Sequence, residues 1–216
     1  MRKYILSVFF ISLLVFFVEA EHFSIKKRNT NSLDSVSYRS GDIIFQTTTG
    51  GQSMAIKLAT HSKYTHVGMI FYENNIPFVY EAVQPVKKTP LIEWIDHGVN
   101  KHFVVKRLIK ADSVLSNEVL NKIKLNFNSF VNKNYDLYFG WSDDKLYCSE
   151  LVWKLYKNAT GLEIGKLHHL KDFDLSSEIV KKKLKERYGN KIPYDEIAIS
   201  PQAIFDSKLI TTVITK

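Results

Sequence analysis

The chain of 216 residues lacks several features that would place it in a class at once. It has one cysteine, Cys148, so no disulfide can form within the chain and a disulfide framework is excluded. It has no internal repeats, no low-complexity segment and no nucleic-acid-binding motif. Beyond residue 20, no stretch is long and apolar enough to span a membrane.

The first twenty residues have the pattern of a secretory leader. Arg2 and Lys3 precede a run from residue 5 to 18 that is apolar except for two serines. Val18 and Ala20 then place small residues at the positions that a signal peptidase reads. We therefore predict cleavage after Ala20 and a secreted or periplasmic protein. An uncleaved N-terminal membrane anchor is the alternative.

The remaining residues are enough for one domain with a substantial core. Residues 21–39 are polar and charged, and we expect a flexible lead-in. Residues 40–216 are expected to form the single domain. The formal net charge of the chain is +8, which suits anionic partners such as a cell envelope. Because the lysines are scattered, a generally basic surface is favoured over a nucleic-acid site.

The order of hydrophobic patterns predicts an α+β domain with a mainly antiparallel sheet, because strands and helices do not alternate regularly. Apolar or alternating stretches predict strands at 41–46 (with a turn at the start), 65–72, 77–83, 102–108 and 209–214. Helical spacing predicts helices at 52–62, 90–96, 117–132, 148–161 and 176–187, and another that begins at Ser200-Pro201. An aromatic loop is expected at 134–144.

Cys148 stands directly before an apolar helical pattern, so it is expected in the first turn of a helix. The free N–H groups and the dipole at a helix start favour a thiolate over a thiol. A thiolate is the nucleophile that cysteine catalysis needs. The alternative is a buried structural cysteine that packs as a small apolar residue. A secreted chain whose cysteine has no partner favours the reactive interpretation.

A cysteine nucleophile also needs a base and a group that orients the base. Of seven histidines, His66 alone lies inside a predicted strand, because His102 flanks the turn at the start of its strand. His66 shares a face with Gly68, which we expect to leave open space beside it. An even-numbered hairpin loop pairs Glu73 with Ile76, and the same register places Gly68 opposite Glu81. His66 and Glu81 are then diagonal neighbours on one face. The alternatives are a core histidine and a solvent-facing strand carboxylate.

Four segments together resemble the YiiX-type permuted papain-like amidases, a circularly permuted branch of the NlpC-type cysteine hydrolases. They are residues 41–46, 59–68, 79–83 and 147–153. The histidine precedes the cysteine, as the permuted branch requires. The resemblance extends from about Gly41 to Ser200-Pro201. It implies Cys148 as nucleophile, His66 as base and Glu81 as the acid that orients the base. It also implies a small barrel-like antiparallel sheet packed on the helix that carries Cys148.

The expected mechanism forms an acyl-enzyme, with the backbone N–H of Cys148 and a second donor on the oxyanion. Tyr147 and Tyr64 are candidates for the second donor, with simple packing as the alternative for each. No cofactor is expected. A metal site is not expected either, because His61 and His66 lie across a helix-to-strand break and no carboxylate cluster completes a ligand set.

Other polar residues near Cys148 have competing interpretations. Glu150 is expected to complement the helix dipole rather than contact substrate. Asp136, Trp141, Asp143 and Asp144 could line a cleft or order their own loop.

The expected function is a secreted or periplasmic hydrolase that cleaves an amide bond, with envelope peptides as the expected substrates. A first alternative is an acyltransferase or a lipid or ester hydrolase of the same fold. A second alternative is an envelope-binding protein without catalysis.

Overall fold

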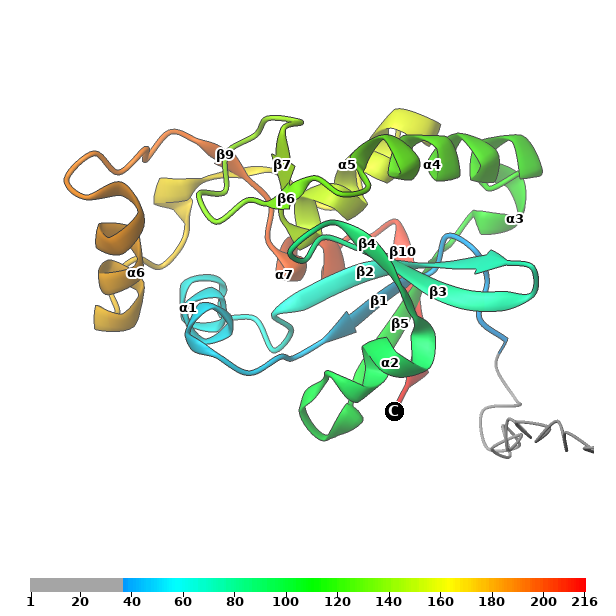
Figure 1. The fold of residues 1–216 in the computed structure, drawn as a ribbon, viewed down its shortest axis with the longest axis horizontal. Helices are drawn as coiled ribbons and strands as arrows, with labels where there is room; N and C mark the ends of the chain where they lie inside the picture. The colour runs from blue at the N-terminus through cyan, green and yellow to red at the C-terminus, as the bar shows by residue number, and fades with distance from the viewer. Residues whose placement is uncertain (1–36) are drawn as a thin grey trace, which may run out of the picture. The chain divides into compact units, whose positions relative to one another are not determined.

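The computed structural model describes residues 37–216, so the predicted leader and most of the lead-in lie outside the described residues. The main sheet has six strands in the order β10-β5-β1-β2-β3-β4 (Figure 1). These strands are β1 (Ile43–Gln46), β2 (His66–Glu73), β3 (Ile76–Glu81), β4 (Lys87–Pro90), β5 (Phe103–Leu108) and β10 (Ile210–Thr215). Every neighbouring pair is antiparallel, which confirms the predicted α+β class, and the sheet is open at β10 and β4.

Helices cover both faces of this sheet. They are α1 (Gly51–Thr60), α2 (Leu91–Asp96), α3 (Ala111–Val114), α4 (Asn117–Phe130), α5 (Cys148–Thr160), α6 (Glu178–Tyr188) and α7 (Pro201–Phe205), with short 3-10 turns at Val99–Lys101 and Leu170–Asp172. Helix α5 packs on β2 and is covered in turn by α4, whereas α2 packs against β3 and β4. Two small ladders complete the fold: β6 (Asn134–Tyr135) pairs with β7 (Lys145–Leu146), and β8 (His168–His169) pairs with β9 (Ile197–Ala198).

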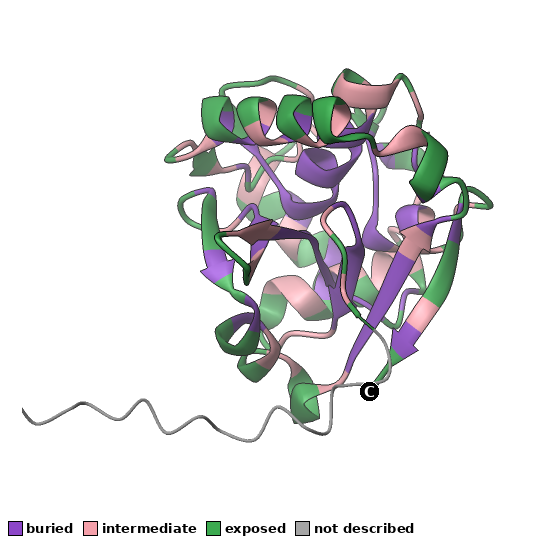
Figure 2. Ribbon diagram, turned by 90° about the vertical axis from the view of Figure 1, so that its right-hand side faces the viewer, coloured by how far each residue is buried: buried purple, intermediate pink, exposed green. Residues whose placement is uncertain are grey.

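The alternation of side chains along β2 divides the core into two clusters. Val67 and Met69 face α5 and belong to the larger cluster, and Ile70 belongs to a smaller cluster around Trp94 of α2. Figure 2 shows the buried residues concentrated in the sheet and in α5 beneath an exposed outer face of α4. Helix α5 is therefore the central helix, which explains why its first turn is shielded from water.

The β2–β3 hairpin has the predicted register. Glu73 pairs with Ile76 and Met69 with Tyr80, around a two-residue turn. Asn74 and Asn75 form the turn with φ values of 50° and 63°. Asparagine tolerates this left-handed backbone better than most residues, so the two asparagines fix the turn and with it the register.

Gly68 does not leave open space beside His66, contrary to the expectation above. A Cβ atom on Gly68 would lie 2.4 Å from Cγ1 of Val79 and 3.0 Å from the carbonyl oxygen of Tyr80. The glycine instead permits a close approach of β3, whose Val79 side chain fills the site.

We predict that Gly68→Ala lowers the free energy of unfolding by about 1–3 kcal/mol, because the stiff Val79 side chain must move to admit a methyl group. The urea midpoint measures this loss. Gly51→Ala is the matched control, because its Cβ would meet only the end of the Lys183 side chain at 3.6 Å. Equal midpoints for the two variants would contradict the close approach.

Two other features differ from the sequence prediction. Strand β4 was not predicted, because its sequence is Lys-Lys-Thr-Pro and lacks an apolar pattern. In the helix predicted at 52–62, the helical spacing places Met54 partly inward, but in the structure Met54 is 47% exposed. Helix α1 packs against α6 through the face that carries Ala55, Leu58 and Ala59, and this face turns Met54 outward. Among the residues that the structure describes, no helix is long and apolar enough to cross a membrane.

Candidate active site

Cys148 is the first residue of α5, as predicted, and is 2% exposed. Tyr147 before it is extended, which starts the helix sharply at the cysteine. Pairing of β2 with β3 begins only at Met69, so the strand end at residues 66–68, which pairs with β1 on one side, has no ladder partner in β3 on the other. The sulfur accepts hydrogen bonds from the backbone N–H groups of Val67, in that strand end, and of Ser149, in the helix. Both groups stabilise negative charge on the sulfur.

His66 is the first residue of β2 and lies between Cys148 and Glu81. Its Nε2 is 2.6 Å from Oε2 of Glu81. A carboxylate can only accept, so Nε2 carries the proton in this contact and Nδ1 is left for the sulfur, to which the ring is also hydrogen-bonded. The indole of Trp94 stacks on the imidazole, with ring centroids 5.7 Å apart. The ring is thereby held in position and oriented.

Glu81, the last residue of β3, is 3% exposed and fully partnered. Besides His66, its Oε2 accepts from Nε1 of Trp94 at 2.9 Å, and its Oε1 accepts from the hydroxyl of Thr89 in β4. Three donors from three different elements make the burial of this carboxylate tolerable. They also fix the plane of the carboxylate, which in turn fixes the tautomer of the imidazole.

The electrostatics of the three residues favour the charged pair. Burial raises the pKa of the Cys148 thiol, but the hydrogen bond and charge of His66 outweigh burial and hold this pKa below its usual range. Burial lowers the pKa of His66, but hydrogen bonds and charges from Cys148 and Glu81 raise it to about 10. Burial raises the pKa of Glu81, but the hydrogen bond and charge of His66, together with the donors Thr89 and Trp94, bring this pKa below its usual value. A thiolate beside an imidazolium is therefore the favoured state near neutral pH.

Tyr135 is a residue of this site that sequence reasoning missed. Its hydroxyl accepts from Nε2 of Gln52 at 2.9 Å, and the charge of Cys148 and a hydrogen bond to it are among the causes that raise the pKa of Tyr135. Oε1 of Gln52 accepts in turn from Arg187 at 3.4 Å. Burial and the nearby thiolate raise the pKa of Tyr135, so the phenol keeps its proton and can donate it to the sulfur or to a substrate oxygen.

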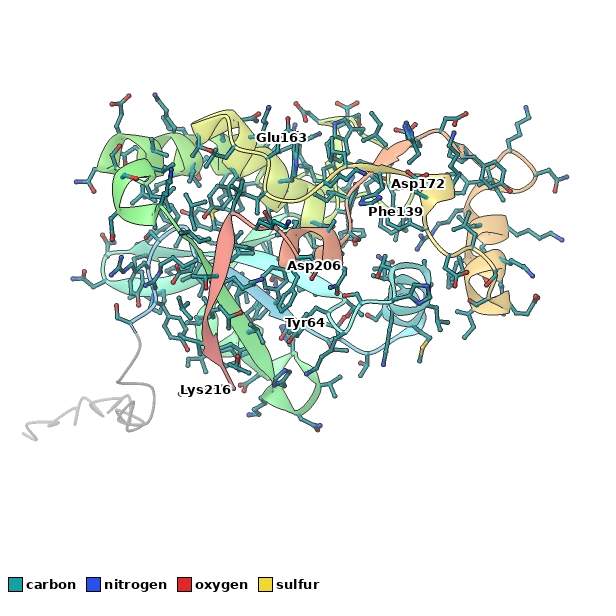
Figure 3. All side chains as sticks on the ribbon, turned by 180° about the vertical axis from the view of Figure 1, so that it is seen from behind. Tyr64, Phe139, Glu163, Asp172, Asp206 and Lys216 are labelled. Atoms are coloured by element: carbon teal, nitrogen blue, oxygen red, sulfur yellow. The ribbon has the colours of Figure 1, made fainter. Side chains whose placement is uncertain are left out.

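The two tyrosines proposed from the sequence are placed differently. The hydroxyl of Tyr147 accepts from the backbone N–H of Ile199 at 3.0 Å, and its ring packs edge-on against Phe139. Tyr64, which is labelled in Figure 3, is buried and packs against Phe45 and Phe205. It lines neither of the two cavities near the site. The structure therefore brings Tyr147, but not Tyr64, next to Cys148, and Tyr135 is the phenol that contacts the sulfur.

The acidic residues near Cys148 make their contacts within the loop at 134–144 and with Lys154 of α5. Glu150 is fully buried and forms an ion pair with Lys154 at 2.8 Å. Lys154 also pairs with Asp143 at 2.7 Å and lies over the ring of Trp141. Asp136 accepts from the backbone N–H of Tyr138 within the same loop. These contacts order the loop before α5.

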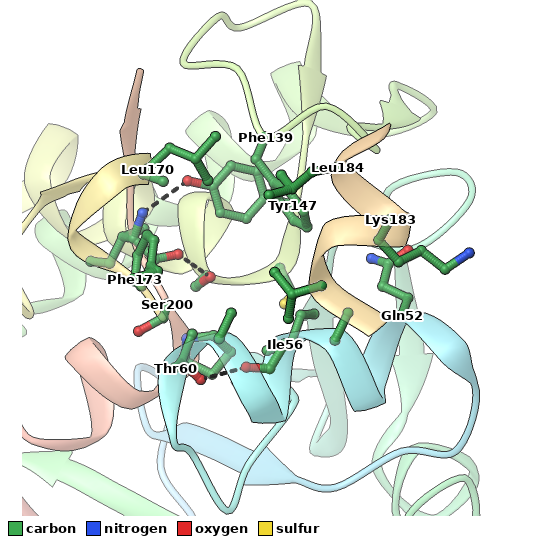
Figure 4. A pocket seen from close by; sticks show the side chains of 18 of the residues that line it. Gln52, Ile56, Thr60, Phe139, Tyr147, Leu170, Phe173, Lys183, Leu184 and Ser200 are labelled. Atoms are coloured by element: carbon green, nitrogen blue, oxygen red, sulfur yellow. Dashed lines mark hydrogen bonds between the residues drawn. The ribbon is translucent and has the colours of Figure 1, made fainter. Parts of the chain in front are cut away.

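An apolar pocket opens beside Cys148 and Ser149 (Figure 4). Its apolar walls come from α1, α6 and the segments around 170 and 199, and they include Ala55, Ile56, Leu170, Phe173, Val180 and Leu184. Gln52 and Tyr135 stand where the pocket meets the sulfur. A polar group would gain little here, whereas an aliphatic group would bury apolar surface next to the reacting atom.

A comparison with solved structures found a crystal structure described as that of the metalloprotein yiiX from Escherichia coli O157:H7. It superposes with a TM-score of 0.78 at 49% identity, and the match covers 82% of this chain and 97% of that one. No group of three or more histidine, cysteine, aspartate or glutamate side chains is placed to hold a metal ion within residues 37–216. The donor set of the described residues therefore does not fit a metal site.

Comparisons of the sequence give the family. The uncharacterized protein YiiX of Escherichia coli K12 is 50% identical over 175 residues, which are 81% of this chain and 85% of that protein. The sequence model of the permuted papain-like amidases of the YaeF/YiiX type, family C92, matches residues 37–214. That match spans nearly all of the described domain, and it confirms the resemblance seen in the sequence. The chain belongs to the YaeF/YiiX family of permuted papain-like amidases.

Proposed function

We propose that the chain is a cysteine hydrolase that cleaves an amide bond through an acyl-enzyme on Cys148. The observation that carries this proposal is the series Cys148–His66–Glu81, in which a buried thiol with a lowered pKa faces an oriented imidazole. A structural cysteine needs neither a charged partner nor hydrogen bonds that stabilise its thiolate.

The proposed reaction proceeds in two steps. The thiolate of Cys148 attacks the acyl carbon, and the imidazolium of His66 gives its proton to the departing amine as the C–N bond breaks. Water, deprotonated by the then neutral His66, hydrolyses the thioester and restores the thiol. Glu81 stays ionised throughout and stabilises the imidazolium.

We propose two donors for the oxyanion of the tetrahedral intermediates. One is the backbone N–H of Cys148, at the start of α5. The other is the hydroxyl of Tyr135, which reaches the sulfur and is held by Gln52. A donor that is fixed before the reaction stabilises developing charge without further reorganisation.

We predict that Tyr135→Phe lowers kcat by about 100-fold while leaving KM within a few-fold, as expected for a donor that acts on the oxyanion. Tyr138→Phe is the matched control, since Tyr138 lies in the same loop, is 49% exposed and lines neither cavity. Steady-state kinetics on one substrate compare the two. An unchanged kcat in Tyr135→Phe removes Tyr135 from the oxyanion site.

The apolar pocket suggests which half of the substrate stays on the enzyme. The acyl group is bonded to the sulfur in the intermediate, so its substituent extends into a space that Cys148 itself lines. An aliphatic acyl chain or an apolar side chain fits that lining. The same observation favours a second candidate function, in which the scissile bond is an ester or the acyl group passes to another acceptor.

The leader pattern in the sequence supports a periplasmic or secreted enzyme, with an N-terminal anchor as the alternative. We therefore propose envelope components as the source of substrate. Incubation with an envelope extract, acid quenching and intact-mass spectrometry would detect the acyl group on Cys148. A peptide acyl mass supports the amide function and a fatty acyl mass the second candidate. No adduct, together with a thiol that reacts no faster than free cysteine, supports a binding protein without catalysis.

A further inference from the structure

A second cavity, the polar cleft, meets the site from the side of His66 rather than Cys148. His66 and Glu81 line it, but Cys148 does not. The polar cleft and the apolar pocket share Gln52, Ile56 and Tyr135. The two cavities therefore meet at these shared residues, one lined by Cys148 and the other by His66.

The chemistry of acyl transfer assigns different halves of a substrate to the two cavities. The acyl half remains on the sulfur of Cys148, whereas the amine half receives its proton from His66 and departs. The amine half must therefore lie against the imidazole, which is the wall of the polar cleft. This step rests on the proposed function, because it assumes that Cys148 forms an acyl-enzyme.

The polar cleft has a mixed lining, in which Ala82, Val83 and Leu137 stand beside polar side chains and one lysine, whereas the lining of the apolar pocket is almost wholly apolar. Besides the shared residues, the polar side chains of the cleft include Gln46, Thr48, Ser53, Gln84, Lys87 and His97. Glu81 is the one carboxylate in the lining, and three donors already occupy its oxygens. Net positive charge in a cleft attracts an anion and raises its local concentration.

Lys87 has no partner that would neutralise it. Lys87 is exposed and is the cross-strand neighbour of Glu81, but no ion pair or side-chain hydrogen bond joins its ammonium group to another residue in the described part of the chain. Its neighbour Lys88 points to the other face of β4, where it forms an ion pair with Glu73. Gln46 also lines the cleft, and its Oε1, which lies beside Gly98, is buried and has no hydrogen-bond partner within residues 37–216. An N–H group of a ligand would supply that partner.

We propose that the polar cleft binds an amine leaving group that carries a free carboxylate, and that Lys87 binds this carboxylate. The substrate class is then an N-acyl amino acid, or an N-acylated peptide whose carboxylate lies close to the scissile amide. Hydrolysis breaks the C–N bond, transfers the His66 proton to the nitrogen and releases a free amino acid or short peptide. The carboxylate and the apolar acyl group together make the substrate amphiphilic.

The test compares two probes that differ only in charge, N-dodecanoyl-alanine and N-dodecanoyl-alaninamide. We expect the ratio of their kcat/KM values to favour the carboxylate in the unaltered protein. We expect Lys87→Met to lower that ratio about fivefold, as the loss of one solvent-exposed ion pair predicts. High salt should also lower the ratio for the unaltered protein, because it screens the charge of Lys87. Lys88→Met, the matched control, should keep the original ratio.

Binding to the Cys148→Ala variant provides a readout that needs no turnover. Tighter binding of the carboxylate probe, weakened about fivefold by Lys87→Met, supports the inference even when neither probe is cleaved. Cleavage of both probes at equal rates, or the same ratio in both lysine variants, overturns the inference and leaves the hydrolase intact. Equal binding of the two probes also overturns it. Absence of cleavage with selective binding counts against the proposed function alone.

Discussion

Replacement of Cys148 by alanine is expected to abolish turnover, with kcat falling at least about 1,000-fold. The thiolate is the atom that forms the covalent bond, and nothing else in the site can replace it. The melting temperature should stay nearly unchanged, because the substitution removes one small atom. The ion pair between His66 and Glu81, 2.6 Å apart in the unaltered protein, does not involve the sulfur and should persist in the variant. Steady-state kinetics measures kcat, and a thermal scan on the same preparation measures the melting temperature.

A serine at the same position provides a sharper comparison. Cys148→Ser keeps a hydroxyl in place of the thiol, but a serine hydroxyl does not form an anion beside an imidazolium at neutral pH. We expect it to be almost as inactive as alanine. Full activity in either variant would assign the reaction to another residue.

Glu81→Gln is expected to lower kcat/KM by about 100-fold or more at neutral pH. Both oxygens of Glu81 accept hydrogen bonds, from His66, Thr89 and Trp94. The amide of glutamine replaces one of these oxygens with an NH₂ group, which is a donor, so the side chain can no longer accept all three bonds. Loss of the negative charge also removes a cause that raises the pKa of His66. The variant should still fold, because its shape is conserved.

The pH profile of kcat/KM for Glu81→Gln should be narrower than that of the unaltered protein, because both of its limbs move inward. A lower His66 pKa makes the imidazolium lose its proton earlier as the pH rises, so the alkaline limb moves to lower pH. A weaker imidazolium stabilises the thiolate less, so the pKa of Cys148 rises and the acid limb moves to higher pH. Glu73→Gln is the control, because Glu73 belongs to the same hairpin but pairs with Lys88 and Tyr80. A similar profile in both variants would exclude Glu81 as the residue that orients the imidazole.

The positions of Cys148, His66 and Glu81 could be predicted because each depends on a local rule. The cysteine precedes an apolar helical pattern, and a helix start follows from it. The two asparagines at 74 and 75 require a tight turn, and the turn alone determines which strand residues face each other. From that register, the shared face of His66 and Glu81 follows without any tertiary contact.

The remaining contacts of the site depend on tertiary structure. Tyr135 reaches the sulfur because the two-residue strand β6 pairs with β7, directly before α5, and no periodic pattern marks so short a ladder. Thr89 lies in β4, an edge strand whose lysines and proline are typical of edges but do not form an apolar pattern. Gln52 is one polar residue on a helix, and only the packing of α1 against α6 turns it toward Tyr135.

The central claim is that His66 holds the Cys148 thiol as a thiolate, and the pH dependence of alkylation tests it most directly. The rate constant for reaction with iodoacetamide is measured from pH 4 to 10 for the unaltered protein and for His66→Gln. We predict that the unaltered protein reacts with an inflection well below that of a free thiol, and that the variant loses this reactivity at acid and neutral pH. An inflection near the free-thiol value in both proteins would contradict the thiolate–imidazolium pair.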